Sequence, residues 1–249
     1  MRSRHRHFNP RDAGATIALD SRYGFNQSDG TAVSTWDDRS RTNNDGTQAS
    51  ALSRPTYEIN EIGGQPAIRF DGSNDFLSFT TSNFTYTSGA SVFAVIKPTS
   101  KSSGYASVIA EYNGTGTSIG CQPSVFPNNA IEPSTDVFGP GGIRRNSTVT
   151  NSTWFICGWH WSNWSTHKTN GNTRISVNGE ETLGAAYGSN PSGFTSTTKS
   201  IGRFEGSTSS SSNFLQSDIA LISAMPAIEL SLRKRLYHAA AFSFKIVCS

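Results

Sequence analysis

Aromatic side chains that could bind a sugar are concentrated in one segment, WFICGWHWSNW at residues 154–164, which holds four of the five tryptophans. Exposed tryptophans at this density would form a sugar-stacking platform, whereas buried ones would only fill the core of a β-sheet. As a strand, the segment places Phe155, Cys157, Trp159 and Trp161 on one face, because successive side chains alternate between faces. That face is apolar throughout, so we expect Phe155, Cys157 and Trp159 to be core.

The end of this strand and the loop after it keep the candidates for glycan binding. Trp161 lies at the end of the strand and Trp164 in the loop after it, and His160 and Asn163 are adjacent to them in the sequence. These four residues form the predicted glycan-binding site.

Nucleophilic catalysis has one candidate motif, GTSIG at 116–120, which places Ser118 in the G-x-S-x-G pattern of a nucleophile elbow. That motif requires a strand that turns sharply into a helix. The following residues, CQPSVFPNN, contain two prolines and no helical period. We therefore predict that Ser118 is not a nucleophile.

Glycosidic cleavage requires two carboxylates on one groove, and no strand carries the alternating acids that would supply them. Glu58 and Glu61 are in odd register, while the pairs Asp37–Asp38 and Glu180–Glu181 are adjacent and should point to opposite faces. Acids from separate strands could still converge, so a glycosidase stays open as an alternative. We predict no catalytic residue and a protein that is not an enzyme.

Calcium has one candidate loop, DGSND at 71–75, which places Asp71 and Asp75 at the first and fifth positions of a cation loop. An EF-hand would require glycine and glutamate where Phe76 and Ser82 stand. The segment therefore favours a hairpin turn, and a calcium ion held by Asp71, Asp75 and other loop oxygens stays open. No other cofactor is expected.

Composition favours short strands joined by turns. Only 16% of residues are charged, and 23 glycines and 10 prolines break the chain frequently, which disfavours a helical bundle. The net charge of +3 is too small to indicate a nucleic-acid partner. No apolar run is long enough for membrane insertion. Three cysteines without a CxxC spacing indicate neither a disulfide framework nor a zinc site.

The expected elements are mostly strands, followed by one amphipathic helix over about 228–242. In the helix, Leu232 and Leu236 begin an apolar stripe, Ser231 is the expected N-cap, and the basic run 233–235 should face solvent. The expected strands span 16–20, 66–70, 75–79, 91–98, 106–112, 153–161, 173–179, 199–204 and 217–225.

We expect one all-β domain over 12–249, preceded by a basic N-terminal arm over 1–11. The arm residues that should contact an assembly partner are Arg2, Arg4, Arg6 and Arg11.

Four segments in order resemble the concanavalin A-like, laminin-G-like jelly-roll superfamily, in the form found in bacterial surface proteins and phage structural proteins. They are VSTWDDRSRTNNDG, GGQPAIRFDGSNDFLSF, NSTWFICGWHW with TRISVNGEE, and SIGRF with the C-terminal SDIALISAM segment. The resemblance implies a two-sheet antiparallel jelly-roll sandwich with a closing C-terminal helix. Arg41 and Thr42 replace the usual Gly-Asn of the first motif, and Leu221 replaces an acid of the last.

The resemblance and the absence of a catalytic set predict a non-enzymatic bacteriophage virion protein: a head decoration, head fibre or tail-associated β-sandwich. It would contact major capsid or tail subunits as a homo-oligomer or symmetric array, and could also hold the particle to host-surface glycans. Without a signal peptide, it would be made in the host cytoplasm and localise to the virion. The alternatives are a carbohydrate-binding or adhesion module of a bacterial surface protein and, second, a polysaccharide-acting glycosidase.

Overall fold

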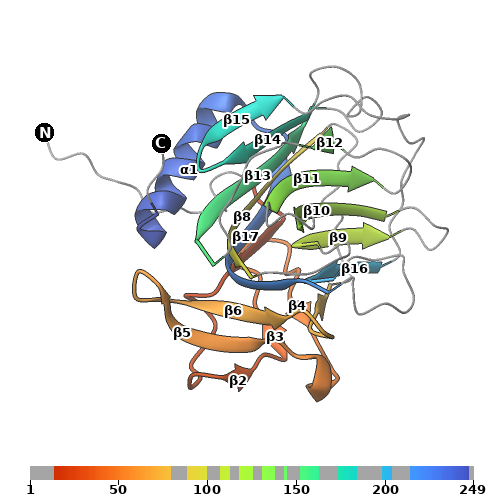
Figure 1. Ribbon diagram of the computed structural model, residues 1–249, viewed down its shortest axis with the longest axis vertical. Coiled ribbons are helices and arrows are strands. Elements are labelled where there is room, and N and C mark those ends of the chain that lie inside the picture. The colour runs from red at the N-terminus through yellow and green to blue at the C-terminus, as the bar shows by residue number, and fades with distance from the viewer. Residues whose placement is uncertain are drawn as a thin grey trace, which may run out of the picture.

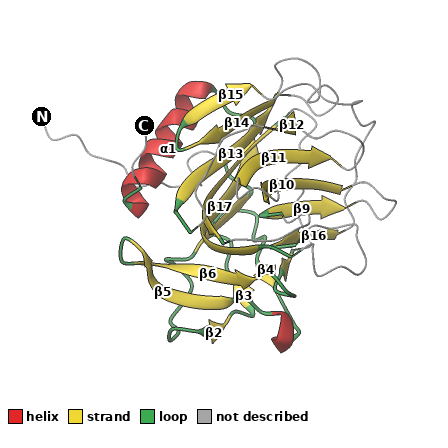
Figure 2. Ribbon diagram, viewed as in Figure 1, coloured by secondary structure: helices red, strands yellow, loops and turns green. Residues whose placement is uncertain are grey.

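The computed structural model describes residues 14–79, 89–99, 107–112, 118–125, 131–137, 143–144, 152–162, 173–183, 198–203 and 214–246. Two antiparallel sheets and one C-terminal helix make up this part of the chain (Figures 1 and 2). The predicted all-β, two-sheet sandwich is therefore confirmed. The predicted arm lies outside the described residues, and its separation from a single domain over 12–249 stays a prediction.

The first sheet carries the long, buried strands. Its order is β15 (Glu180–Leu183), β14 (Thr173–Val177), β13 (Phe155–Trp161), β8 (Ala90–Pro98), β17 (Gln216–Pro226), β6 (Gln65–Asp71), β5 (Thr56–Ile62) and β2 (Thr31–Ala32). Strand β1 (Ile17–Asp20) also pairs with β17. Strands β8 and β17 are almost continuously buried because both faces of the sheet are covered here.

The second sheet is built from shorter strands. Its order is β12 (Ile143–Arg144), β11 (Ile131–Val137), β10 (Ser118–Val125), β9 (Ile109–Tyr112), β16 (Thr198–Ile201), β7 (Leu77–Ser78), β4 (Gly46–Thr47) and β3 (Thr35–Trp36). A one-turn 3-10 helix at Ala51–Ser53 precedes β5.

The core lies between the two sheets. Trp159 and Phe70 from the first sheet meet Leu77, Ile109 and Ile201 from the second, all at most 1% exposed. The alternation predicted for β13 is confirmed, because all four apolar residues of its inner face belong to this core. The opposite face of β13 packs against the C-terminal helix.

The helix α1 (Leu230–Phe244) forms a third layer against the outer face of the first sheet (Figure 1). The expected bounds of 228–242 are shifted by two residues. Ser231 is not the N-cap: Glu229 takes that place, and its carbonyl accepts the backbone N–H groups of Leu232 and Arg233. Lys245 ends the helix in the left-handed conformation, with φ 55°. None of the described helices is long and apolar enough to cross a membrane.

The second sheet shows where the predicted strands were wrong. The strand expected over 75–79 shortens to β7, and β10 and β11 were not expected because Pro123 and Pro133 interrupt their apolar pattern. Ser118 begins β10 and pairs with Tyr112 of β9. It therefore lies in an antiparallel ladder, as expected of a serine that is not on a nucleophile elbow.

Candidate functional site

Three neighbouring strands of the first sheet place polar residues in one row beneath α1. His160 of β13 pairs with Ser91 of β8 on one side and with Arg174 of β14 on the other. Directly paired residues of antiparallel strands point to the same face of the sheet. The face is the one toward the helix, because His160 contacts Tyr237 of α1.

The adjacent row has no side chain at its centre, because β13 carries Gly158 there. A Cβ atom at Gly158 would overlap the Tyr237 hydroxyl and would lie 2.6 Å from Ser176 Oγ. The hydroxyl occupies this space and shares a 2.7 Å hydrogen bond with His160 Nε2. Phe93 packs edge-on against the Tyr237 ring. The absence of a side chain at Gly158 thus allows the helix to dock close to the sheet.

A second contact fixes the start of the helix. Arg233 Nε and Nη2 donate to the two carboxylate oxygens of Glu181 on β15, at 2.6 and 2.9 Å, and Nη1 donates to the Ile228 carbonyl. The side chain of Arg233 is only 11% exposed. The expectation that Arg233 faces solvent is therefore wrong, because a bidentate carboxylate partner offsets the cost of burying its charge.

Between the row and the first helical turn lies a pocket of about 110 Å³ with a mixed polar and apolar lining. It lies where β13 ends and β8 begins. The residues that line it are Ala90, Ser91, His160, Trp161, Ser162, Arg174, Ala227, Ile228 and Arg233. We refer to it as the strand-end pocket.

His160 is neutral in this pocket. Burial lowers the pKa of His160 well below its usual value of 6.5, and the positive charges of Arg233 and Arg174 lower that pKa further. Tyr237 occupies Nε2, whereas the buried Nδ1 has no hydrogen-bond partner in the described part of the chain. A neutral imidazole can present Nδ1 as a donor or an acceptor, depending on its tautomer.

The structure divides the predicted glycan-binding residues. His160 lines the strand-end pocket, so it stays a candidate, but Trp161 is 3% exposed and belongs to the core between the sheets. Stacking of a sugar on the Trp161 ring is inconsistent with this burial, because the alternation of β13 turns that ring inward. Asn163 and Trp164 lie outside the described residues, and their role stays a prediction.

Arg174 and Ser91 were missed from the sequence. Neither lies in a motif, and each strand contains at least one other polar residue that does not line the pocket. Their only signal is their position opposite His160, which becomes visible once β14, β13 and β8 are known to be neighbours.

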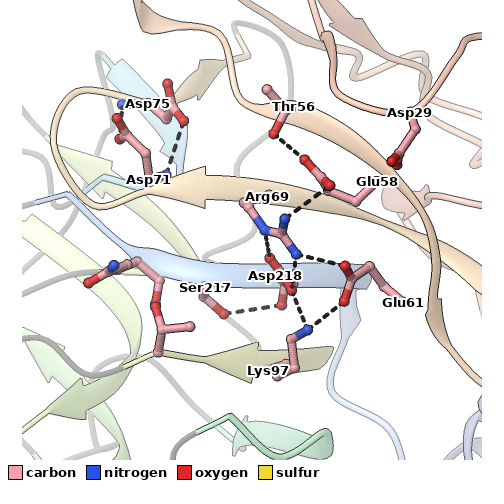
Figure 3. Close-up of polar contacts among 12 residues, drawn as sticks. Asp29, Thr56, Glu58, Glu61, Arg69, Asp71, Asp75, Lys97, Ser217 and Asp218 are labelled. Carbon is pink, nitrogen blue, oxygen red and sulfur yellow. Dashed lines mark hydrogen bonds and ion pairs between the residues drawn. The ribbon is translucent and has the colours of Figure 1, made fainter.

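A second polar cluster lies on the same sheet, where five charged side chains from β5, β6, β8 and β17 meet (Figure 3). Arg69 contacts Glu58, Glu61 and Asp218 at 3.0, 2.7 and 2.8 Å. Lys97 contacts Glu61 at 2.5 Å and Asp218 at 2.7 Å. We refer to these five residues as the ion cluster.

The ion cluster corrects the expectation that Glu58 and Glu61 point apart. The pairing of β5 with β6 changes register between Glu58 and Ile62, and Asn60 within this interval has φ 58°. This irregularity turns the strand so that both glutamates reach Arg69. Carboxylates do converge here, from separate strands.

Arg69 and Lys97, the cations of the ion cluster, form ion pairs with these carboxylates. A hydrogen bond from Arg69 to Asp218 raises the pKa of Arg69 above its usual value. Burial alone would lower the pKa of Lys97, but its contacts with Asp218 and Glu61 outweigh burial and raise it. Both cations therefore stay charged. The arrangement braces four strands.

The predicted calcium residues, Asp71 and Asp75, close the turn that connects β6 of the first sheet to β7 of the second (Figure 3). The hairpin predicted for this segment is therefore wrong, because the two strands do not pair with each other. Asp71 Oδ1 accepts the backbone N–H groups of Ser73 and Asn74, and Asp75 accepts that of Asp71 at 3.0 Å. Burial raises the pKa of Asp75 to about 6; the hydrogen bond from Asp71 opposes this and the Asp71 charge adds to it. Within the described ranges, no three His, Cys, Asp or Glu side chains group as a metal site. Calcium at this turn stays a prediction.

The WDD segment is structural. Asp38 is buried, and its oxygens accept the backbone N–H groups of Ala18 at 2.8 Å, Ser40 at 2.9 Å and Asn44 at 2.8 Å. Asp45 in turn accepts the N–H of Asp38. These bonds fix the loop between β3 and β4 to strand β1 and leave Asp38 little capacity for a ligand.

Comparisons with known proteins identify the fold. No protein-family model matches the chain, and neither does any curated protein sequence. Among solved structures, domain 4 of AbnA, a GH43 extracellular arabinanase from Geobacillus stearothermophilus in complex with arabinotriose, aligns with a TM-score of 0.56 at 11% identity. That alignment covers 91% of this chain and 98% of the arabinanase domain.

Two further structures are similar. Trypanosoma rangeli sialidase in complex with sialic acid aligns with a TM-score of 0.57 at 10% identity over 93% of this chain. The chain spans about a third of the sialidase length, 33%. The binding domain of Paraclostridial Mosquitocidal Protein 1 aligns at 0.55 and 13% identity, over 93% of this chain and 53% of that one. These likenesses establish a β-sandwich fold and no more.

Proposed function

We propose that this protein is a non-catalytic carbohydrate-binding module. The observation that carries the proposal is the row of Ser91, His160 and Arg174, which gives the strand-end pocket a polar floor on a rigid sheet. Sugar sites combine a few fixed hydrogen-bonding groups with a concave surface. The chain also covers nearly all of a similar arabinanase domain that was crystallised with a trisaccharide.

The charged groups on the outer face favour binding over hydrolysis. A glycosidase requires one carboxylic acid to donate a proton and one free carboxylate. In the ion cluster, Arg69 and Lys97 occupy the acids that converge, and in the strand-end pocket Arg233 holds both oxygens of Glu181. These acids are braces within the fold, and none is offered to a substrate.

A glycan array probed with the full chain tests the proposal. We expect retention of at least one glycan class, and calorimetry should then give a dissociation constant in the micromolar to millimolar range. Release of reducing ends from β-glucans or galactans would instead support the glycosidase. An array without any retained glycan contradicts the module.

A blocking variant assigns binding to the pocket. Ala227 is exposed at the pocket lining, so Ala227→Trp should close the pocket without disturbing the core. We expect it to abolish retention while the unfolding temperature stays unchanged. Ala51→Trp, at another exposed alanine in the 3-10 helix, is the matched control and should bind as the wild type does.

The place where the module works is a separate proposal. The basic arm over 1–11 supports a virion component, in which the sandwich would present its pocket to host-surface glycans. Deletion of residues 1–11 should leave the sandwich folded and weaken co-sedimentation with capsid or tail subunits. Failure of the intact chain to co-purify with any particle would favour a cell-surface module.

A further inference from the structure

Among the described residues, the strand-end pocket contains one positive charge without an ion-pair partner. Arg233 is held by Glu181 in a bidentate pair. Arg174 lines the same pocket, and none of the described residues forms an ion pair with it. Of the described residues, two arginines and one paired glutamate give the pocket a net charge of about +1, because His160 is neutral.

A second observation points to a ligand. His160 is 3% exposed, and its Nδ1 atom has no hydrogen-bond partner in the described part of the chain. A buried polar atom without a partner is costly, and a ligand is one way to satisfy it. Its other ring nitrogen is fixed by Tyr237, so the ring orientation is set before any ligand arrives.

Ser91 completes the set of polar groups. Its Oγ accepts the backbone N–H of Ile228 at 3.3 Å, so the hydroxyl hydrogen can still donate. The pocket therefore offers a guanidinium fork and a hydroxyl, and the imidazole ring of His160 lies beside them. When Tyr237 donates to Nε2, the Nδ1 hydrogen makes His160 a donor as well, and the three groups together match the acceptor oxygens of an anion.

The size of the pocket limits what enters it. A volume of about 110 Å³ holds several water molecules, but it is well below the roughly 300 Å³ of pockets that enclose a drug-sized ligand. The pocket fits an end group, and the remainder of the ligand would lie outside it.

We propose that the strand-end pocket binds the anionic substituent, a carboxylate or a sulfate ester, of an acidic glycan, with Arg174 as the ion-pair partner. This inference rests on the proposed carbohydrate-binding function and names the sugar class. Ser91 and His160 donate hydrogen bonds to the same anion. Neutral sugars leave Arg174 without a counter-charge and bind more weakly.

Calorimetry on the full chain tests the proposal with oligogalacturonate, a sulfated galactan and neutral galactan oligosaccharides. We expect one or both acidic ligands to bind at least about tenfold more tightly than the neutral one, since hydrogen bonds to charged groups are the stronger kind. The two acidic ligands separate carboxylate from sulfate. The preference should shrink as salt is raised.

Matched variants localise the effect. Arg174→Gln should lower acidic-glycan affinity by about tenfold to a hundredfold and neutral-glycan affinity by much less, so that the preference for acidic glycans is lost. Arg174→Lys keeps the charge but loses the guanidinium fork, so its affinity for acidic glycans should lie between those of the wild type and Arg174→Gln. Arg235→Gln, at an exposed arginine of α1, is the control and should bind as the wild type does. Circular dichroism checks that each variant is folded. If Arg174→Gln unfolds, the affinity of Arg174→Lys is the test in its place.

Each failure has its own signature. If the wild type retains no glycan of any charge, the proposed function fails. If it retains glycans but binds neutral and acidic ones equally, or if Arg174→Gln binds acidic glycans normally, only this inference is overturned. If a polyglutamate peptide bound as tightly as the acidic glycans, this inference would also be overturned, because the pocket would then bind anionic groups whether or not they belong to a sugar.

Discussion

The hydroxyl of Tyr237 provides a direct test of how α1 is attached to the sheet. Tyr237→Phe keeps the ring that packs on Phe93 but removes the oxygen that hydrogen-bonds His160 Nε2 at 2.7 Å. Both ring nitrogens of His160 would then be buried without a partner among the described residues. Leaving a buried polar group unsatisfied costs about 1–3 kcal/mol.

Urea denaturation at pH 8, followed by tryptophan fluorescence, measures this loss. Trp159 reports on the same strand from the core side, where it is fully buried. For a chain of this length, the expected loss corresponds to a fall in unfolding temperature of roughly 2–4 °C per kcal/mol. Hydrogen exchange in α1 should also accelerate, because the helix loses a fixed contact.

Tyr23→Phe is the matched control. Tyr23 is 46% exposed, so removal of its hydroxyl should change the free energy of unfolding by less than about 0.5 kcal/mol. The reasoning is refuted if the two variants are equally stable, because His160 would then not depend on Tyr237 for its hydrogen bond.

Three further predictions concern titration and charge. Because burial lowers the pKa of His160, its contribution to folding stability should be complete above about pH 6.5 and lost as the pH falls below that value. In a pH series of unfolding curves, the free energy of unfolding should fall with pH in this range, and His160→Gln should remove that dependence. The pKa of Asp75 is raised to about 6, so its ionised form opposes folding at pH 8. Asp75→Asn should therefore stabilise the protein at pH 8 by up to about 2 kcal/mol and lose this gain near pH 4. A gain that does not change with pH would show that the ionisation of Asp75 is not its cause. Asp218→Asn should destabilise by about 2–3 kcal/mol in urea denaturation, because Arg69 and Lys97 would face each other with one counter-charge fewer; an unchanged midpoint would show that the ion cluster is not a brace.

The sandwich could be predicted because its signals are local. The inner face of β13 was identified from residue alternation alone, and Phe155, Cys157 and Trp159 are all fully buried in the core. Strands β10 and β11 were not identified, since prolines break their pattern and the pairing of β10 with β9 and of β11 with β10 supplies what the pattern lacks.

The candidate site could be predicted only in part, because it depends on which strands are neighbours. His160 was identified from its residue type, but Arg174 and Ser91 acquire meaning only through the register that aligns them with it. Likewise, the irregularity at Asn60 brings Glu58 and Glu61 together, and a two-residue periodicity has no means of foreseeing it. Trp161 failed as a stacking residue because its exposure is decided by packing partners distant in sequence.

The alternation of β13 has a consequence for how this molecule can change over generations. Its odd-numbered residues hold the two sheets together, while His160 on the even face meets the pocket beside Arg174 and Ser91. Under the proposed function, substitutions in that row would alter ligand preference without touching the contacts between the sheets. Mutational tolerance along the strand should therefore alternate with a period of two. A library restricted to these three positions would vary ligand specificity, while the opposite face of β13 would keep the fold stable.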